Sequence, residues 1–119
     1  MTNSIGEIEF NDVLFIIGSN ATEAHPIIGN KMKKAALRGA KLIVVDPRRT
    51  ELAEYAHLWL RLRPCTDNAL VNGLLRIIIS NDLHDKAYID ERCEGFYDLW
   101  EVVRQYTPDR VSEITGVPE

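Results

Sequence analysis

The sequence lacks the features that mark several large classes of protein. Its only two cysteines, Cys65 and Cys93, stand far apart and outside any CxxC or Cys/His pattern, which favours reduced thiols over a disulfide or a metal site. No apolar stretch approaches the roughly 20 residues that a membrane-spanning helix needs. The first residues have neither the basic nor the apolar region of a signal peptide. We therefore expect a soluble, cytoplasmic protein without a membrane span.

The sequence also lacks long runs of like charge and the common nucleotide-binding motifs. The formal net charge is −4, and basic and acidic residues are interspersed, whereas a nucleic-acid-binding protein would carry a basic face or tail. No GxGxxG follows the first apolar run, which disfavours an ordinary nicotinamide or flavin site, and no GxxxxGK[ST] marks a P-loop. The three histidines have no metal-ligand spacing. We expect no nucleic-acid partner, no metal ligand and no catalytic residue in this chain.

What is present is the pattern of an α/β domain. The 119 residues, of which 45% are hydrophobic, suffice for one core. Residues 13–17 and 41–46 are short apolar runs without polar alternation, as in the buried strands of a parallel sheet. Residues 26–38 between them have helical spacing and are followed by Gly39. This order predicts a right-handed βαβ unit, and residues 57–62 predict a third strand.

The remaining segments are predicted to be mostly helical. They comprise a short helix or turn at 4–9, a short helix at 50–55, a longer helix opening at Thr66 or Asp67, helices at 85–93 and 96–106, and a last one capped by Thr107 and ended by Gly116. Together the patterns predict a single α/β domain over residues 1–119. Its expected architecture is a three-layer, Rossmann-like parallel sheet with helices on both faces.

Three segments with small, polar or charged residues follow the predicted strands: 18–25, 46–50 and 64–67. Ligands of open parallel sheets bind beyond the carboxyl ends of the strands, so we expect these segments to converge there. Gly18 suits a sharp turn, and a helix that begins at Pro26 would present free N–H groups to an anion. The sequence thus predicts an anionic, nucleotide-like ligand.

Each candidate contact also has a purely structural interpretation. Ser19 and Asn20 could merely turn the chain. Asp46 could accept hydrogen bonds from ribose hydroxyls or a base edge, while Arg48 and Arg49 suit either phosphate binding or a solvated turn. Thr66 and Asp67 are preferred helix caps, yet the Asp67 carboxylate could also accept the N1–H and N2–H donors of guanine.

Four stretches carry a resemblance to a known family: IGSNATEAHPIIG (17–29), GAKLIVVDPRRTELAEYA (39–56), RPCTDNALVNGLL (63–75) and DKAYIDERCEGFYDL (85–99). They closely resemble the molybdopterin oxidoreductase family, and within it the catalytic α subunits of formate dehydrogenases. The likeness is collinear over almost the whole chain. It implies a domain that binds molybdopterin guanine dinucleotide.

The resemblance assigns a role to each strand-end segment. It implies that Gly18, Ser19, Asn20 and Glu23 lie along the pterin–diphosphate side, that Asp46, Arg48 and Thr50 lie at the nucleotide end, that Thr66 and Asp67 take the guanine, and that His25 and Pro26 begin the helix beneath the cofactor. Two residues depart from the family pattern: Cys65 replaces a usual glycine, and His57 replaces a frequent aspartate. A side chain at position 65 would either point away from the cofactor or narrow its site.

The resemblance further implies an internal fragment of a larger oxidoreductase. The parent would bind molybdenum or tungsten through the dinucleotide, and an iron–sulfur cluster in a preceding segment. Its partners would be the remaining domains of the subunit and electron-transfer subunits. The fragment alone would be inactive and, with apolar surface exposed, would self-associate. The alternatives are the equivalent domain of a nitrate reductase or related molybdopterin enzyme and, from another class, a stand-alone α/β nucleotide-binding or interaction module.

Overall fold

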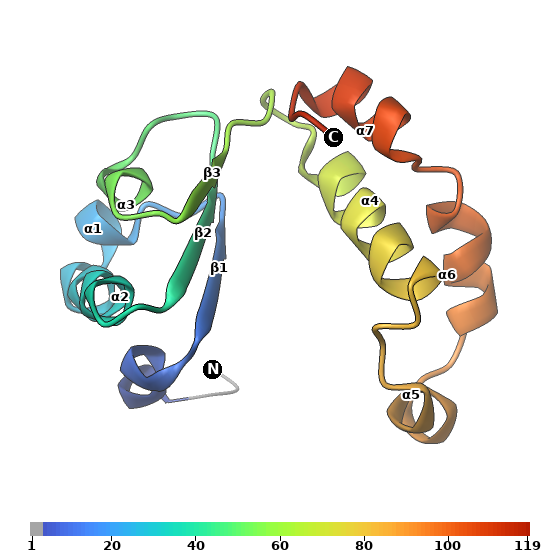
Figure 1. The fold of residues 1–119 in the computed structure, drawn as a ribbon, viewed down its shortest axis with the longest axis horizontal. Helices are drawn as coiled ribbons and strands as arrows, with labels where there is room; N and C mark the ends of the chain where they lie inside the picture. The colour runs from blue at the N-terminus through green and yellow to red at the C-terminus, as the bar shows by residue number, and fades with distance from the viewer. Residues whose placement is uncertain (1–3) are drawn as a thin grey trace. The chain divides into compact units, whose positions relative to one another are not determined.

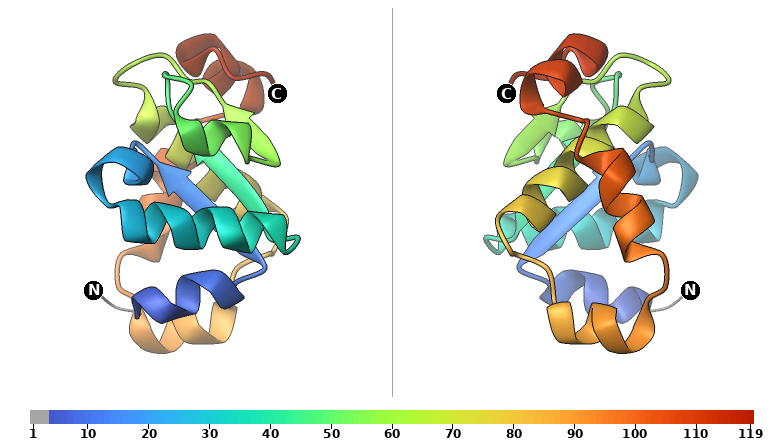
Figure 2. Two further views of the ribbon diagram at one scale, coloured as in Figure 1. Left: turned by 90° about the vertical axis from the view of Figure 1, so that its left-hand side faces the viewer. Right: turned by 90° about the vertical axis from the view of Figure 1, so that its right-hand side faces the viewer.

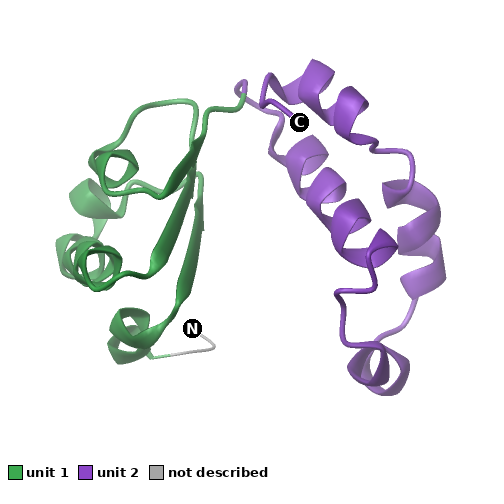
Figure 3. Cartoon of the chain, in the orientation of Figure 1, with its two compact units in different colours: residues 1–62 green, residues 63–119 purple. Residues whose placement is uncertain are grey.

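The computed structural model describes residues 4–119. They belong to two compact units, residues 1–62 and residues 63–119, drawn in different colours in Figure 3. Each unit is described by itself below, with the element labels of Figure 1. The single α/β domain expected over residues 1–119 stays a prediction.

Unit 1 is built on a parallel sheet of three short strands, β1 (Val13–Ile17), β2 (Lys41–Val45) and β3 (Leu58–Leu60), in that order. The predicted α/β fold with a parallel sheet is therefore confirmed. The third strand is shorter than the predicted 57–62, because the N–H of Leu62 bonds to the carbonyl of Leu60 at 3.2 Å and bends the chain out of the strand.

The helices of unit 1 are η1 (Ile5–Phe10), a 3-10 helix, and α1 (Ala21–Ala24), α2 (Pro26–Leu37) and α3 (Glu51–Glu54). The predictions for η1, α2 and α3 are confirmed with small shifts at their ends. The structure adds α1, where the sequence predicted a loop leading directly to Pro26. Two alanines and a glutamate favour helix there, and the N–H of His25 closes the turn on the carbonyl of Ala21 at 3.0 Å.

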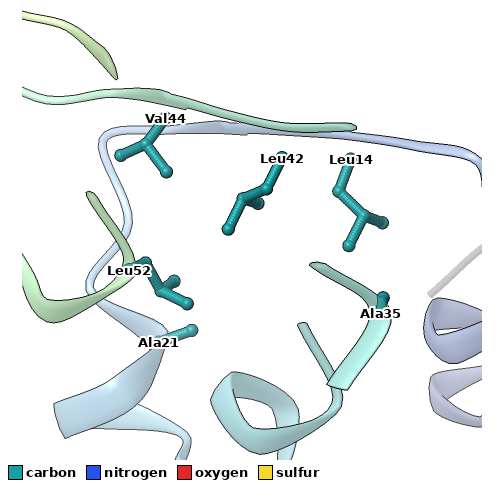
Figure 4. Close-up of a cluster of buried hydrophobic side chains, with 6 residues drawn as sticks. All are labelled: Leu14, Ala21, Ala35, Leu42, Val44 and Leu52. Carbon is teal, nitrogen blue, oxygen red and sulfur yellow. The ribbon is translucent and has the colours of Figure 1, made fainter. Parts of the chain in front are cut away.

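The core of unit 1 lies between the sheet and these helices. Figure 2 (left) shows α1, α2 and α3 in front of the strands, all on one face. Side chains from the sheet point toward side chains from the helices in Figure 4, and the cluster consists of Leu14, Leu42 and Val44 with Ala21, Ala35 and Leu52. Small residues let α1 and α2 approach closely: a Cβ at Gly29 would lie 3.0 Å from Cα of Thr22. This packing fixes the segments that leave the strands.

Unit 2 is helical and contains α4 (Asp67–Ser80), α5 (Lys86–Arg92), α6 (Phe96–Val103) and α7 (Pro108–Thr115). Side chains cap two helix starts, of which the sequence predicted only the cap at Thr107. The carboxylate of Asp85 accepts the N–H of Tyr88 at 2.9 Å, and the hydroxyl of Thr107 accepts that of Arg110 at 3.4 Å. Gly116 ends α7 in a left-handed conformation, φ +74°. No helix among residues 4–119 has the length and apolarity needed to cross a bilayer.

A glycine on α4 sets how closely α7 packs. A Cβ built at Gly73 would lie 2.7 Å from Cγ2 of Val111, inside any normal contact distance. Gly73 and Val111 are both buried, so neither helix can move aside without opening the core of unit 2. Glycine is thus required at position 73 by the helix contact.

Substitution of Gly73 tests this contact. We expect Gly73→Ala to lower the free energy of unfolding by about 1–3 kcal/mol, since the added methyl overpacks the interface, although alanine has the better helix propensity. Urea unfolding followed by circular dichroism measures the change. In the double variant with Val111→Ala the two losses should not add, because the methyl then has room. Additive losses would contradict the clash.

A salt bridge network joins η1 to α2. The Glu9 carboxylate lies 2.8 Å from Nζ of Lys31 and 3.4 Å from a guanidinium nitrogen of Arg38, and the Glu9 side chain is only 14% exposed. The hydrogen bond from Lys31, supported by the charges of Lys31, Lys34 and Arg38, lowers the pKa of Glu9 below its ordinary value of 4.5. The folded state therefore favours the ionised carboxylate.

The lowered pKa makes the stability of unit 1 depend on pH. A carboxyl whose pKa falls on folding stabilises the protein fully above its unfolded pKa, and this contribution is lost as the pH drops through the folded-state pKa. We expect Tm to fall below about pH 4.5, and we expect Glu9→Gln to flatten that acid limb of the Tm–pH curve. The control is Glu7→Gln, which removes an exposed carboxylate of the same helix. Parallel acid limbs in wild type and Glu9→Gln would refute the role of Glu9.

Candidate functional site

The carboxyl ends of β1 and β2 bring the first two predicted segments together. Ile17 pairs with Val45, and the N–H of Gly18 continues the ladder to the carbonyl of Val45 at 3.0 Å. Gly18 and Asp46 thus leave the sheet side by side. Gly18 has φ +59° and open space where a Cβ would stand, so the left-handed backbone, rather than crowding, calls for glycine.

Asp46 is the most constrained of the candidate residues. It is 3% exposed, and its Oδ1 accepts the backbone N–H of Arg48 at 2.8 Å, which forms a tight turn after β2. Its own carbonyl accepts the indole N–H of Trp59 at 2.9 Å. Nε of Arg48 lies 3.7 Å from Oδ1, with the Arg48 side chain 73% exposed. The carboxylate is therefore buried and oriented, while the guanidinium beside it faces solvent.

Thr50 leaves a polar atom without a partner. The residue is 6% exposed, and its buried Oγ1 has no hydrogen-bond partner among residues 4–119. It occupies the N-cap position of α3 without making a side-chain cap. A buried hydroxyl left unpaired costs about 1–3 kcal/mol, so such atoms in native proteins call for an explanation such as a water or a ligand.

The first segment differs from the sequence expectation in its local structure. The helix α2 begins at Pro26 as predicted, but the one-turn helix α1 lies between β1 and α2, so the strand does not lead directly into α2. Asn20 precedes α1, and its Oδ1 accepts the hydroxyl of Thr22 at 2.8 Å instead of capping the helix. Ser19 and Glu23 are exposed. Their side chains are accessible on the same segment as Gly18.

The third segment begins α4 in unit 2. Thr66 occupies the N-cap position, but its hydroxyl donates to the carbonyl of Arg63 at 2.7 Å and makes no cap, so the capping interpretation of its side chain is wrong. Asp67 is the first helical residue and half-buried. Cys65 is exposed and has φ +65°, a conformation that favours glycine. This explains in physical terms why glycine suits the position.

Two residues that hold these segments escaped the sequence analysis. Trp59 and Arg63 both donate from side chains to backbone carbonyls, at Asp46 and at Glu113 respectively. The partners of these two side chains lie 13 and 50 residues away in the chain, and contacts over such separations leave no local sequence pattern. The sequence shows only a tryptophan in a short strand and an arginine before a proline. Among residues 4–119, no three His, Cys, Asp or Glu side chains gather as a metal site would require.

Comparisons with known proteins show the family of this chain. The model of the molybdopterin oxidoreductase family matches residues 1–109. The F420-dependent formate dehydrogenase subunit alpha of Methanocaldococcus jannaschii is 46% identical over 117 residues, 98% of this chain and 17% of the relative. Formate dehydrogenase H of Escherichia coli is 41% identical over 117 residues, 98% of this chain and 16% of the relative.

A solved structure extends the likeness to the fold. Acetylene hydratase from Pelobacter acetylenicus has a TM-score of 0.82 and 40% sequence identity, with 95% of this chain and 17% of that chain covered. The chain thus spans about a sixth of the length of the relatives it matches. The match of the family model over most of the sequence, together with these identities, shows that the chain belongs to the molybdopterin oxidoreductase family.

Proposed function

We propose that this chain is the cofactor-binding domain of a molybdopterin-dependent formate dehydrogenase α subunit. The observation that carries the proposal is the identity of 41–46% to relatives named as formate dehydrogenases, over 98% of the chain. The likeness to acetylene hydratase supports a second candidate, the equivalent domain of a related molybdopterin enzyme with another reaction. Both candidates assign the same task to this chain, which is to bind and orient the cofactor.

The strand-end segments of unit 1 would hold the diphosphate and one end of the nucleotide. Gly18, Ser19 and Asn20 would let the backbone approach the pterin–diphosphate side, with the exposed Glu23 on the same segment. The open space at the Cβ position of Gly18 suits a close approach. A negatively charged diphosphate would meet polar backbone groups here rather than a basic patch.

The second segment would bind the nucleotide through three different groups. Asp46 would accept hydroxyl or N–H donors, and Arg48 would reach a phosphate from its exposed position. The ligand would pair with the buried hydroxyl of Thr50, which has no partner among the described residues 4–119. A buried carboxylate and an orphaned hydroxyl on one strand-end turn are the chemistry expected of a polar ligand site. These residues therefore fit the group that the family implies.

In unit 2, Thr66 and Asp67 would take the guanine. The Asp67 carboxylate has two acceptor oxygens, which match the adjacent N1–H and N2–H donors of that base. Neither side chain caps α4, so the Asp67 carboxylate is not committed to the helix end. The guanine dinucleotide form of the cofactor rests on this assignment.

The catalytic chemistry would belong to the whole protein. When bound, the cofactor would supply a molybdenum or tungsten centre for the two-electron oxidation of formate to carbon dioxide and a proton. The family implies an iron–sulfur cluster outside this chain for electron transfer. The name "subunit alpha" of the relatives supports further electron-transfer subunits as partners. We propose a cytoplasmic enzyme in which this chain supplies no catalytic residue.

Guanine nucleotide binding tests the residue assignments. We expect the chain to bind GDP weakly and more tightly than ADP, and Asp67→Ala to remove that preference with a loss of about 1.5–3 kcal/mol, typical of hydrogen bonds to a charged group. Asp46→Ala should weaken GDP and ADP alike, because both nucleotides carry the ribose hydroxyls that the Asp46 carboxylate would accept. Isothermal titration calorimetry measures these affinities.

Matched controls are available for both aspartates. Asp109→Ala removes an acidic residue from the first turn of α7, and Asp12→Ala removes one that precedes β1 at the opposite edge of the sheet. Both should leave nucleotide binding unchanged. Equal affinity of wild type, Asp67→Ala and Asp46→Ala for GDP would contradict the assigned contacts.

The whole protein that carries this chain tests the activity and the form of the cofactor. We expect formate-dependent reduction of an artificial dye, and we expect acid hydrolysis of the purified protein to release guanosine monophosphate together with an oxidised, fluorescent pterin. Chelation of the metal during reconstitution should abolish dye reduction. Pterin without guanine would rule out the dinucleotide, whereas guanine release without formate activity would favour the second candidate.

A further inference from the structure

The backbone that precedes α4 is bound to the end of α7. The N–H of Arg63 donates to the carbonyl of Thr115 at 2.7 Å. Its guanidinium Nη1 donates to the carbonyls of Glu113 at 2.5 Å and Ile114 at 3.3 Å. These three carbonyls belong to the last turn of α7, where no intrahelical donor is available, and a cation is favoured at this negative end of the helix.

The end of α7 is shaped to receive this arginine. Thr115 is fully buried, its hydroxyl donates to the carbonyl of Val111 at 2.7 Å, and it accepts the N–H of Val117 at 3.1 Å. Gly116 turns left-handed at φ +74°, and a Cβ there would lie only 3.4 Å from Nε of Arg63. The close contact of Val111 with Gly73 anchors α7 on α4 at the same time. The carbonyls that Arg63 reaches are therefore held in place.

Arg63 in turn holds the residues proposed to bind guanine. Its carbonyl accepts the hydroxyl of Thr66 at 2.7 Å, and the carbonyl of Thr66 accepts the N–H groups of Ala69 at 3.1 Å and Leu70 at 3.2 Å in the first turn of α4. Cys65, between Arg63 and Thr66, has φ +65°, a backbone conformation that is unfavourable for a residue with a side chain. The turn is thus kept in an otherwise disfavoured conformation by contacts at its ends.

We infer that Arg63 is a positioning residue that fixes Thr66 and Asp67 by linking the turn at residues 63–67 to the end of α7. Its bearing on guanine rests on the function proposed above, but its effect on the turn does not. Removal of the Arg63 guanidinium leaves the carbonyls of Glu113 and Ile114 without this donor. The strained backbone at Cys65 then has fewer contacts that hold it.

Hydrogen exchange of the chain without ligand tests the link. In Arg63→Ala we expect the amides of Ala69 and Leu70 to exchange roughly tenfold faster, because the first turn of α4 opens more often. Amides near the far end of α4, such as Ile79, should exchange as in wild type. Arg63→Lys, which keeps a cationic donor, should restore part of the protection.

Arg110→Ala is the matched control. Arg110 also donates from its guanidinium to a backbone carbonyl, that of Gln105 at 3.3 Å, and lies on α7 itself. It should leave Ala69 and Leu70 unchanged. GDP affinity should fall in Arg63→Ala, because the guanine contacts need the closed turn, and stay at the wild-type value in Arg110→Ala.

The outcomes separate this inference from the proposed function. Unchanged exchange at Ala69 and Leu70 in Arg63→Ala overturns the inference, as does a uniform increase over all of α4 and α7, which indicates a general loss of stability. Faster local exchange with weaker GDP binding supports both. Faster local exchange in a chain whose wild type prefers no guanine nucleotide supports the role of Arg63 in the turn and overturns the guanine assignment.

Discussion

Close packing of short helices against one face of three parallel strands is the constraint on which the site in unit 1 depends. Leu42 and Val44 of β2 lie against Ala21 and Leu52, and these two residues belong to the helices that follow β1 and β2. Because alanine and glycine let the helices approach so closely, the strand-end turns have little freedom. Gly18 and Asp46 are neighbours because the strands before them are paired.

The turn after β2 carries one polar side chain that is held in place and one whose hydroxyl has no partner among residues 4–119. Asp46 is buried and oriented by the N–H of Arg48, while the indole of Trp59 fixes its backbone from β3. Thr50 has a buried hydroxyl without a partner among the described residues. A folded protein tolerates such an atom more readily where a ligand completes its hydrogen bonding. The turn after β2 thus combines an oriented, buried carboxylate with a buried hydroxyl that lacks a partner among residues 4–119.

Unit 2 achieves a similar result without a sheet. The contact between Gly73 and Val111 sets the distance between α4 and α7, and Arg63 joins the end of α7 to the turn that opens α4. Cys65 occupies a left-handed position that this arrangement imposes. A hydrogen-bonded link from one helix end to another helix start compensates for a residue that local preference would not choose.

Local patterns of the sequence were enough for the class of fold and for most elements. The apolar runs at 13–17 and 41–45 become β1 and β2 because short, uninterrupted apolar runs favour strands. Thr107 and Gly116 bound α7 because caps act within one turn. The residues at the strand ends were identifiable for the same reason. The sequence alone also identified the family, because the resemblance extends over several long stretches and does not depend on a single motif.

Only the tertiary structure decided how the site residues are held. The one-turn helix α1 and the early end of β3 depend on packing and on single backbone hydrogen bonds that no periodicity shows. Thr66 is a typical capping residue, yet its hydroxyl turns back to Arg63, whose own partners lie 50 and 51 residues away. The sequence determined which groups follow the strands, and tertiary contacts decided which of them are oriented, because hydrogen bonds across such separations exist only once the chain has folded.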